Sequence, residues 1–125
     1  MNPMRGLALG ALCCALAVIA GAFGAHGLKA RLDTASLELW KTAAQYLFYA
    51  GIGQMVVGVA SVASPGGGFR AATLLILVGG VIFSGTVFAL ALGGPRWLGA
   101  VTPLGGLLLI AGFLATAWSA FRSSV

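Results

Sequence analysis

Charged side chains are missing from most of this 125-residue chain. Its seven Lys and Arg residues and its two acidic residues, Asp33 and Glu38, all lie outside four apolar stretches, which cover residues 6–25, 42–63, 71–94 and 97–121. A helix needs about 20 apolar residues to cross a hydrocarbon core, and each stretch is long enough. The missing charge excludes a soluble domain and predicts four membrane-spanning helices.

Alternation of polar and apolar residues is also missing. A spanning β-barrel needs alternating segments of about 10 residues, and an open sheet leaves edge N–H and C=O groups unpaired in lipid. We therefore expect an all-α membrane protein, with one domain over residues 1–125 folded as a compact four-helix bundle with both termini on one side. A short amphipathic segment within residues 26–41 joins the first two helices, and Asp33 or Thr34 is expected to cap it.

Groups that carry catalytic or metal chemistry are scarce. His26 is the single histidine, and the two carboxylates are outside the spans. Cys13 and Cys14 are adjacent and point about 100° apart on a helix, so they do not form a ligand pair. We expect no metal site, no cofactor and no catalytic residues. An enzyme is the least supported class, because no base is visible for a nucleophile such as Ser84.

The net charge of +5 comes from residues at the ends of the apolar stretches. Such cations meet lipid phosphates, and no basic run predicts a nucleic-acid partner. The side of the membrane with both termini carries Arg5, Arg70 and Arg122, and the opposite side carries Lys29, Arg31, Lys41 and Arg96. This near balance does not decide the orientation, although we favour cytoplasmic termini. The first stretch is longer than a usual signal peptide core of about 7–15 residues, so we expect it to remain as a span.

Small residues recur at helical spacing in the apolar stretches. In the first stretch they follow steps of three and four, which puts them on one face of a helix. Small residues let helix backbones approach closely in lipid, where apolar burial drives little association. We expect helix packing, within the chain or with a second copy, at Gly6, Gly10, Ala17, Gly24, Gly85, Gly105 and Gly112.

Polar residues within the spans collect towards one end of the predicted bundle. The first and third helices end there, and the second and fourth begin there. The candidate polar patch consists of His26, Thr42, Gln45, Tyr46, Tyr49, Ser84 and Thr102, with Ser84 nearer the middle of the membrane. Two interpretations stay open: hydrogen bonding between helices with an aromatic belt, or a pocket for a small ligand closed by His26.

Two further residues interrupt the apolar helices. Gln54 lies deeper than the candidate polar patch and on another face, and we expect it to pair with a neighbouring backbone or with another protomer. Pro103 is expected to kink or restart the fourth helix, with Thr102 bonding the backbone group that the proline frees.

An ordered set of motifs extends over about residues 15–118. Together these motifs resemble the YgdD-like small membrane proteins, known as domain-of-unknown-function family 423. They are Gly21-Ala22-Phe23-Gly24-Ala25-His26, Thr42 with Tyr46, Phe83-Ser84-Gly85, Leu90-Ala91-Leu92 and Thr102-Pro103-Leu104-Gly105-Gly106.

The resemblance implies four membrane helices and no established activity, so it transfers no catalytic residues. Family members carry Tyr-Gln-x-x-His at the start of the second helix, where this chain has Leu47 and Ala50 in place of Gln and His. A role that pairs this second histidine with His26 is therefore in doubt here.

Two functions fit these observations. The first is a non-enzymatic scaffold or accessory subunit with a membrane-protein partner or a second copy, favoured by the small-residue faces. The second is a binding or permeation module for a lipid or a small neutral solute, based on the patch around His26 and Tyr46. Either role places the chain as a multi-pass protein among membrane lipids, most simply in a bacterial inner membrane.

Overall fold

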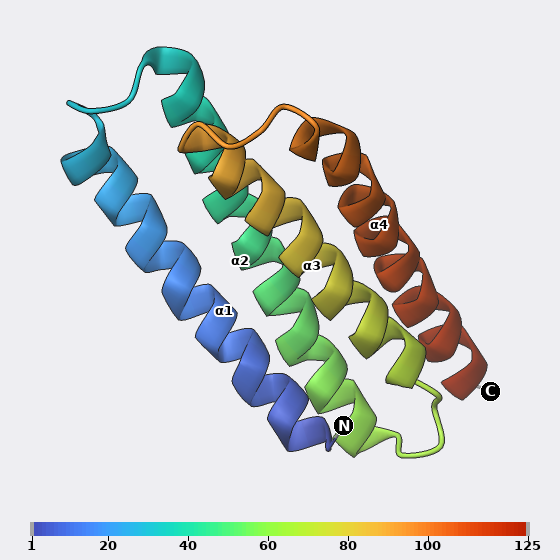
Figure 1. Cartoon of the computed structure of the whole chain (residues 1–125). Coiled ribbons are helices and arrows are strands. Elements are labelled where there is room, and N and C mark those ends of the chain that lie inside the picture. The colour runs from blue at the N-terminus through green and yellow to red at the C-terminus, as the bar shows by residue number, and fades with distance from the viewer. Residues whose placement is uncertain (1, 125) are drawn as a thin grey trace.

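Four long helices and three connections make up the computed structural model, which describes residues 2–124 (Figure 1). The helices are α1 (Pro3–Phe23), α2 (Thr34–Ala63), α3 (Arg70–Ala91) and α4 (Leu98–Ser123), and a π-helical turn, Gly24–Leu28, extends α1. All four are long and apolar enough to cross a membrane. The prediction of an all-α fold with four membrane helices is confirmed.

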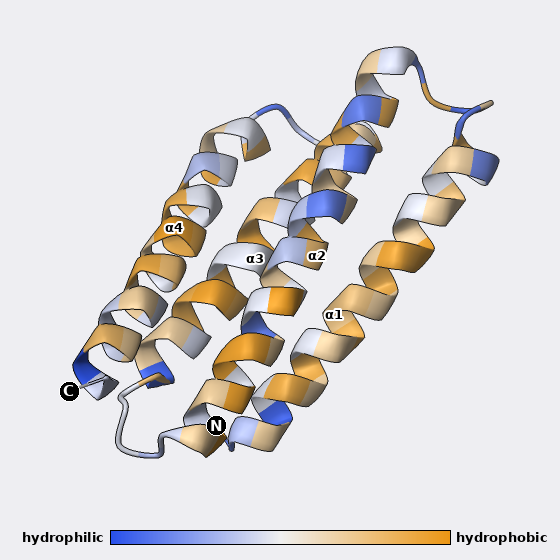
Figure 2. Cartoon of the chain, turned by 180° about the vertical axis from the view of Figure 1, so that it is seen from behind, coloured by the Kyte–Doolittle hydropathy of each residue, from blue (hydrophilic) through white to orange (hydrophobic). Residues whose placement is uncertain are grey.

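The helices stand in a row in the order of the chain. Helix α1 packs along α2, α2 along α3, and α3 along α4, whereas α2 touches α4 at only a few positions. Figures 1 and 2, which show opposite sides, both place α1 and α4 at the two edges. The two hairpins are joined through α2 and α3, and the arrangement is more open than a closed bundle. Both ends of the described chain lie on one side (Figure 1).

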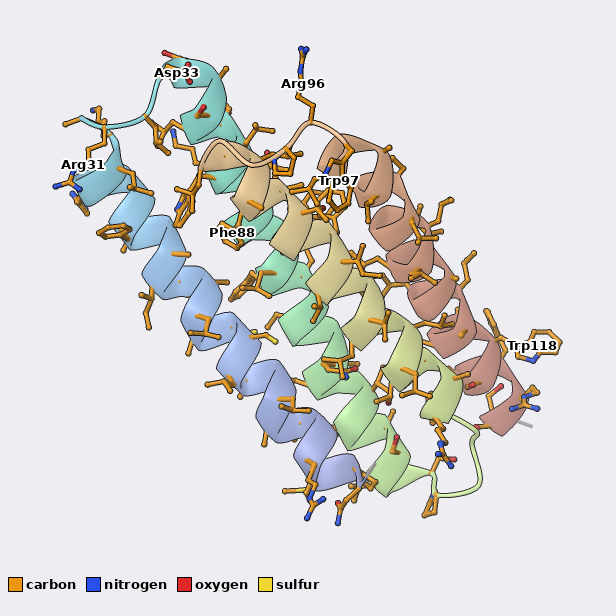
Figure 3. All side chains as sticks on the ribbon, viewed as in Figure 1. Arg31, Asp33, Phe88, Arg96, Trp97 and Trp118 are labelled. Atoms are coloured by element: carbon orange, nitrogen blue, oxygen red, sulfur yellow. The ribbon has the colours of Figure 1, made fainter. Side chains whose placement is uncertain are left out.

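Two exposed tryptophans mark the thickness of the apolar layer. Trp97 and Trp118 are each 65% exposed and lie near opposite ends of α4 (Figure 3). The 21 residue steps from Trp97 to Trp118 correspond to about 32 Å of helix, which is close to the thickness of a hydrocarbon core at about 30 Å. Tryptophan is enriched at both membrane–water interfaces. Hydrophobic residues dominate the helices between these levels (Figure 2).

Glycines set the separation of the paired helices. A Cβ atom at Gly10 in α1 would lie 2.6 Å from the carbonyl oxygen of Gly51 in α2. A Cβ atom at Gly79 in α3 would lie 2.6 Å from the backbone nitrogen of Leu109 in α4. Backbone therefore meets backbone at both crossings, and no side chain fits between them. The same faces bury the other small residues Gly6, Ala17, Gly24, Gly105 and Gly112.

Gly85 lies outside these contacts. It is exposed on α3, and a Cβ atom there would meet no atom of the described residues within 4 Å. Within residues 2–124 the packing predicted for Gly85 is therefore not found. Helix α3 contacts α2 and α4 through other faces than the one that carries Gly85. Packing of Gly85 against a second chain stays a prediction.

The segment expected as a separate amphipathic piece is the first part of α2. Asp33 caps this helix by accepting a hydrogen bond from the backbone nitrogen of Ser36 at 2.8 Å, and this bond lowers the pKa of the Asp33 carboxyl. Helix α2 then runs without a break to Ala63. The segment does not separate because no breaker residue stands between Thr34 and the apolar stretch.

Pro103 does not restart α4, which is continuous from Leu98 to Ser123. The proline removes one backbone N–H, and the Thr102 hydroxyl bonds the Leu98 carbonyl at 3.0 Å. The carbonyl that Pro103 leaves without a backbone donor belongs to Gly99, one residue after Leu98. The expected bond from Thr102 to this freed carbonyl therefore does not form. The connections before α3 and α4 use glycines with positive φ, at Gly68 (73°) and Gly93 (91°).

A test of the backbone contact compares two alanine substitutions on α1. We expect Gly10→Ala to destabilise the fold by about 1–3 kcal/mol, because the new methyl group meets rigid backbone of α2. Gly21→Ala, on the same helix, meets nothing within 4 Å and should leave stability unchanged or slightly raised. Denaturant unfolding in detergent micelles measures both, and equal effects at the two positions would contradict the crossing.

Candidate functional site

The candidate polar patch divides into separate places on the structure. Gln45 and Tyr49 are exposed on α2, where the Gln45 amide donates a hydrogen bond to the Tyr49 hydroxyl. The Tyr49 ring lies edge-on to Tyr46, and the Tyr46 ring tilts over Phe83 of α3 with ring centres 4.4 Å apart. These side chains satisfy or cover one another on the surface of the row, and Tyr49 and Gln45 line two separate, largely apolar grooves and not one shared pocket.

A second polar contact lies between α3 and α4. The hydroxyl oxygens of Thr86 and Thr102 are 2.6 Å apart, and each hydroxyl also lies near a backbone carbonyl of its own helix, that of Ile82 or Leu98. A threonine pair of this kind joins helices in lipid by satisfying both hydroxyls inside the protein. Thr86 is absent from the predicted patch, and its only sequence signal is its position after Ser84 and Gly85.

Aromatic side chains fill the end where His26 was expected to close a pocket. The Trp40 indole N–H donates to the carbonyl oxygen of Ala20 at 2.7 Å, and its ring lies 4.6 Å from that of Phe88. The Trp40 ring also occupies the notch at Gly24, where a Cβ atom would lie 2.5 Å from it. Trp40 of α2 therefore connects α1, α2 and α3 at this end.

His26 and Thr42 stand apart from this aromatic cluster. His26 is exposed on the π-helical turn, and Thr42 is half-buried on α2. Neither side chain has a hydrogen-bond partner among residues 2–124. They do not converge with Tyr46 and Thr102 on one site, and the common membrane depth of these four residues stays a prediction.

The buried polar groups are deeper in the row. Gln54 and Ser84 are each only 2% exposed, and within the described residues neither the Gln54 amide nor the Ser84 hydroxyl has a hydrogen-bond partner. Gln54 faces a narrow crevice between α1, α2 and α3, lined by Cys13, Leu47, Ala50, Leu77, Gly80 and Val81. Of the two pairings expected for Gln54, the one with a neighbouring backbone does not occur.

The same crevice contains the two positions that depart from the resembled family. Leu47 lines it two turns from Gln54, and Ala50 lines it one turn away. Ala50 is buried directly against α3, where a Cβ atom at Gly80 would lie 2.5 Å from its own. The family's histidine position therefore belongs to the α2–α3 interface and not to the end that carries His26.

Metal ligands do not gather in the part of the chain that the structure describes. No group of three His, Cys, Asp or Glu residues lies close enough to hold an ion within residues 2–124. Glu38 instead lies 3.7 Å from Lys41 in an exposed ion pair at the surface, where such a pair contributes little.

A substitution at Trp40 tests how the end of α1 is held. Trp40→Phe keeps an aromatic ring but removes the N–H that bonds the Ala20 carbonyl, so we expect a loss of about 1 kcal/mol in unfolding free energy. Trp97→Phe is the matched control, because Trp97 is exposed and should change stability little. Unfolding in detergent micelles is the measurement, and a cost at Trp97 equal to that at Trp40 would contradict the connecting role.

Comparison with known proteins identifies related sequences. A family model described as a protein of unknown function, DUF423, matches residues 20–106. A UPF0382 membrane protein of Staphylococcus haemolyticus is 44% identical over 114 residues, which cover 91% of this chain and 93% of the relative. The UPF0382 membrane protein YwdK of Bacillus subtilis is 42% identical over 103 residues, which cover 82% and 84% of the two chains. No solved structure matches the chain significantly.

These relatives are bacterial and are named as membrane proteins, and all four helices of this chain can span a membrane. The chain is a multi-pass membrane protein of unknown activity, and it belongs to the DUF423 family.

Proposed function

We propose that this protein is a non-enzymatic accessory subunit that binds a helix of another membrane protein in the groove between α1 and α3. The observation that carries the proposal is the buried Gln54 amide, whose nitrogen and oxygen have no partner among residues 2–124. Burying an amide in an apolar environment without hydrogen bonds costs several kcal/mol. A partner protein that supplies the missing hydrogen bonds would remove this cost.

Water is a poor substitute for such a partner. The crevice at Gln54 has a volume of about 10 Å³, which is at the lower limit for one water molecule. A buried water needs two to four polar partners, and the other side chains that line the crevice are apolar or cysteine. A polar side chain from another helix reaches the amide only when the crevice widens to admit it, and it then supplies the missing hydrogen bonds.

The two helices that flank the crevice leave a face open to a further helix. Helices α1 and α3 both pack on α2, with no extensive contact between them in the described chain. Val81 of α3 is exposed at the side of the crevice, and Gly85, one turn further on, is exposed with open space around it. A glycine that faces lipid permits a second helix to approach the backbone closely. These features favour a partner helix that presents a polar side chain opposite Gln54 and a small residue opposite Gly85.

The other candidate functions have less support. A pocket around His26 and Tyr46 requires side chains that converge, whereas those residues lie on separate surfaces and Trp40 fills the space behind them. Catalysis by Ser84 requires a base, and the Ser84 hydroxyl lies in an apolar interface about 10 Å from the end of α3.

The proposal is tested by native mass spectrometry of the protein released from its own membranes in mild detergent. We expect a stoichiometric complex with one other membrane protein for the wild type. Gln54→Leu and Val81→Trp should each abolish it, because the first removes the amide and the second blocks the groove. Val56→Trp is the control, since Val56 is exposed on the opposite face of α2.

Unfolding measurements on the isolated chain separate loss of binding from loss of folding. Gln54→Leu should leave the monomer as stable as the wild type or more stable, because an unpaired buried amide is replaced by an apolar group of similar size. Release of the wild type as a monomer, or retention of the partner by Gln54→Leu, would contradict the proposal. A homo-oligomer in place of a complex would also contradict it.

A further inference from the structure

A cavity of about 320 Å³ opens at the end of the row that carries both termini. The starts of α1 and α3 and the end of α2 surround it, and its polar lining includes Asn2, Ser61, Ser64, Arg70 and Thr73. This volume is at the lower end of the range for small-molecule sites. The cavity lies at the opposite end of the molecule from His26 and is separate from the Gln54 crevice.

The depth of the cavity matches the lipid headgroups. Gly68 lines it, and the Gly68 carbonyl accepts a hydrogen bond from the Ser119 hydroxyl at 3.1 Å. Ser119 follows Trp118, the exposed tryptophan that marks this boundary of the apolar layer (Figure 3). The cavity is therefore level with the point where acyl chains give way to headgroups.

Positive charge at this end has no acidic counterpart. Arg5, Arg70 and Arg122 lie here, whereas the two acidic side chains of the chain, Asp33 and Glu38, lie at the opposite end. Arg122 donates to the Gly67 carbonyl at 3.4 Å and so is engaged with the loop. Arg70 makes no hydrogen bond or ion pair within residues 2–124, and it lines the cavity.

The placement of Arg5 and Arg70 opposes a general preference of helices. Each lies in the first turn of its helix, α1 or α3, and neither first turn contains an acidic residue. A helix start carries partial positive charge, so acidic residues stabilise it and basic residues do not. Arg70 lines the cavity and Arg5 lies in the first turn of the neighbouring helix, so this end carries a positive potential that a bound anion would neutralise.

Hydroxyl groups complete the set of donors. Thr73 and Ser64 line the cavity, and within the described residues their hydroxyls are free of hydrogen bonds. Ser61 donates to the Val57 carbonyl at 2.8 Å, which leaves its oxygen able to accept from a sugar or glycerol hydroxyl. A phosphodiester with a hydroxylated headgroup matches this mixture of one guanidinium and several hydroxyls.

We propose that this cavity binds the phosphodiester headgroup of one anionic lipid, with Arg70 on the phosphate and the hydroxyls of Ser64 and Thr73 around it. A zwitterionic lipid carries the same phosphate, but its ammonium group would meet the positive potential of Arg70 and the two helix starts. The site therefore selects anionic over zwitterionic lipids.

The test is lipid retention in native mass spectrometry, with purified protein in neutral detergent and added phosphatidylglycerol, phosphatidylcholine or inorganic phosphate. We expect the wild type to retain one phosphatidylglycerol more tightly than phosphatidylcholine. Arg70→Gln should weaken this retention about fivefold, the effect of one interfacial cation. Arg96→Gln removes a cation at the opposite end and should retain the lipid as the wild type does.

Two further arms make the outcome decisive. Thr73→Val keeps the shape of the side chain and should also weaken retention, whereas Gln54→Leu should not affect it. Equal retention of phosphatidylglycerol by the wild type and Arg70→Gln would overturn the proposal, as would equal retention of the two lipids by the wild type. Displacement of phosphatidylglycerol by millimolar inorganic phosphate would overturn the assignment to a lipid and indicate a soluble anion.

Discussion

Close approach of helix backbones is the constraint on which this structure depends. In lipid, apolar side chains gain little by leaving the surroundings for a protein interior, so helices associate through packing at short range. Gly10 with Gly51, and Gly79 with Leu109, bring backbone atoms of neighbouring helices together with no side chain between them. Each hairpin is held in this way, and the contact of α2 with α3 then joins the two hairpins into a row.

A row of four helices has different consequences from a closed bundle. The two edge helices leave most of their surfaces to lipid or to other proteins, and α1 and α3 flank a narrow crevice on α2. Gln54 lies buried in that crevice with its amide unsatisfied in residues 2–124, so an energetically costly group lies between two helices that pack on α2 and not extensively on each other. The open arrangement and the buried amide thus support the same proposal, which is that a helix of another membrane protein binds here.

The two ends of the row differ in how they meet the membrane surface. At the end of α1, the Trp40 ring and its neighbours fill the space between three helices, and the charges there include both signs. At the other end, Arg70 lines a cavity, and the arginines of this end have no acidic side chain beside them. The first end is filled by side chains that hold three helices together, whereas the second has a cavity and positive charge that suit an anionic group.

The sequence by itself determined the class, the number and the approximate limits of the helices. Uninterrupted apolar length, the charged residues between the apolar stretches and the cap at Asp33 are local properties, and each is visible without knowing how helices meet. The up-and-down order of the helices was also predictable, because short connections fix which helix ends lie together.

Only the tertiary structure decided which faces meet. The spacing of Gly85 is as regular as that of Gly10, yet Gly10 contacts a neighbouring backbone and Gly85 faces open space, because helix rotation is set by the best contact over the full length of a pair. For the same reason the polar patch around His26 divided among separate surfaces. The Gln54 crevice and the Arg70 cavity each combine residues from two or three helices, and no periodicity within one segment reports such a combination.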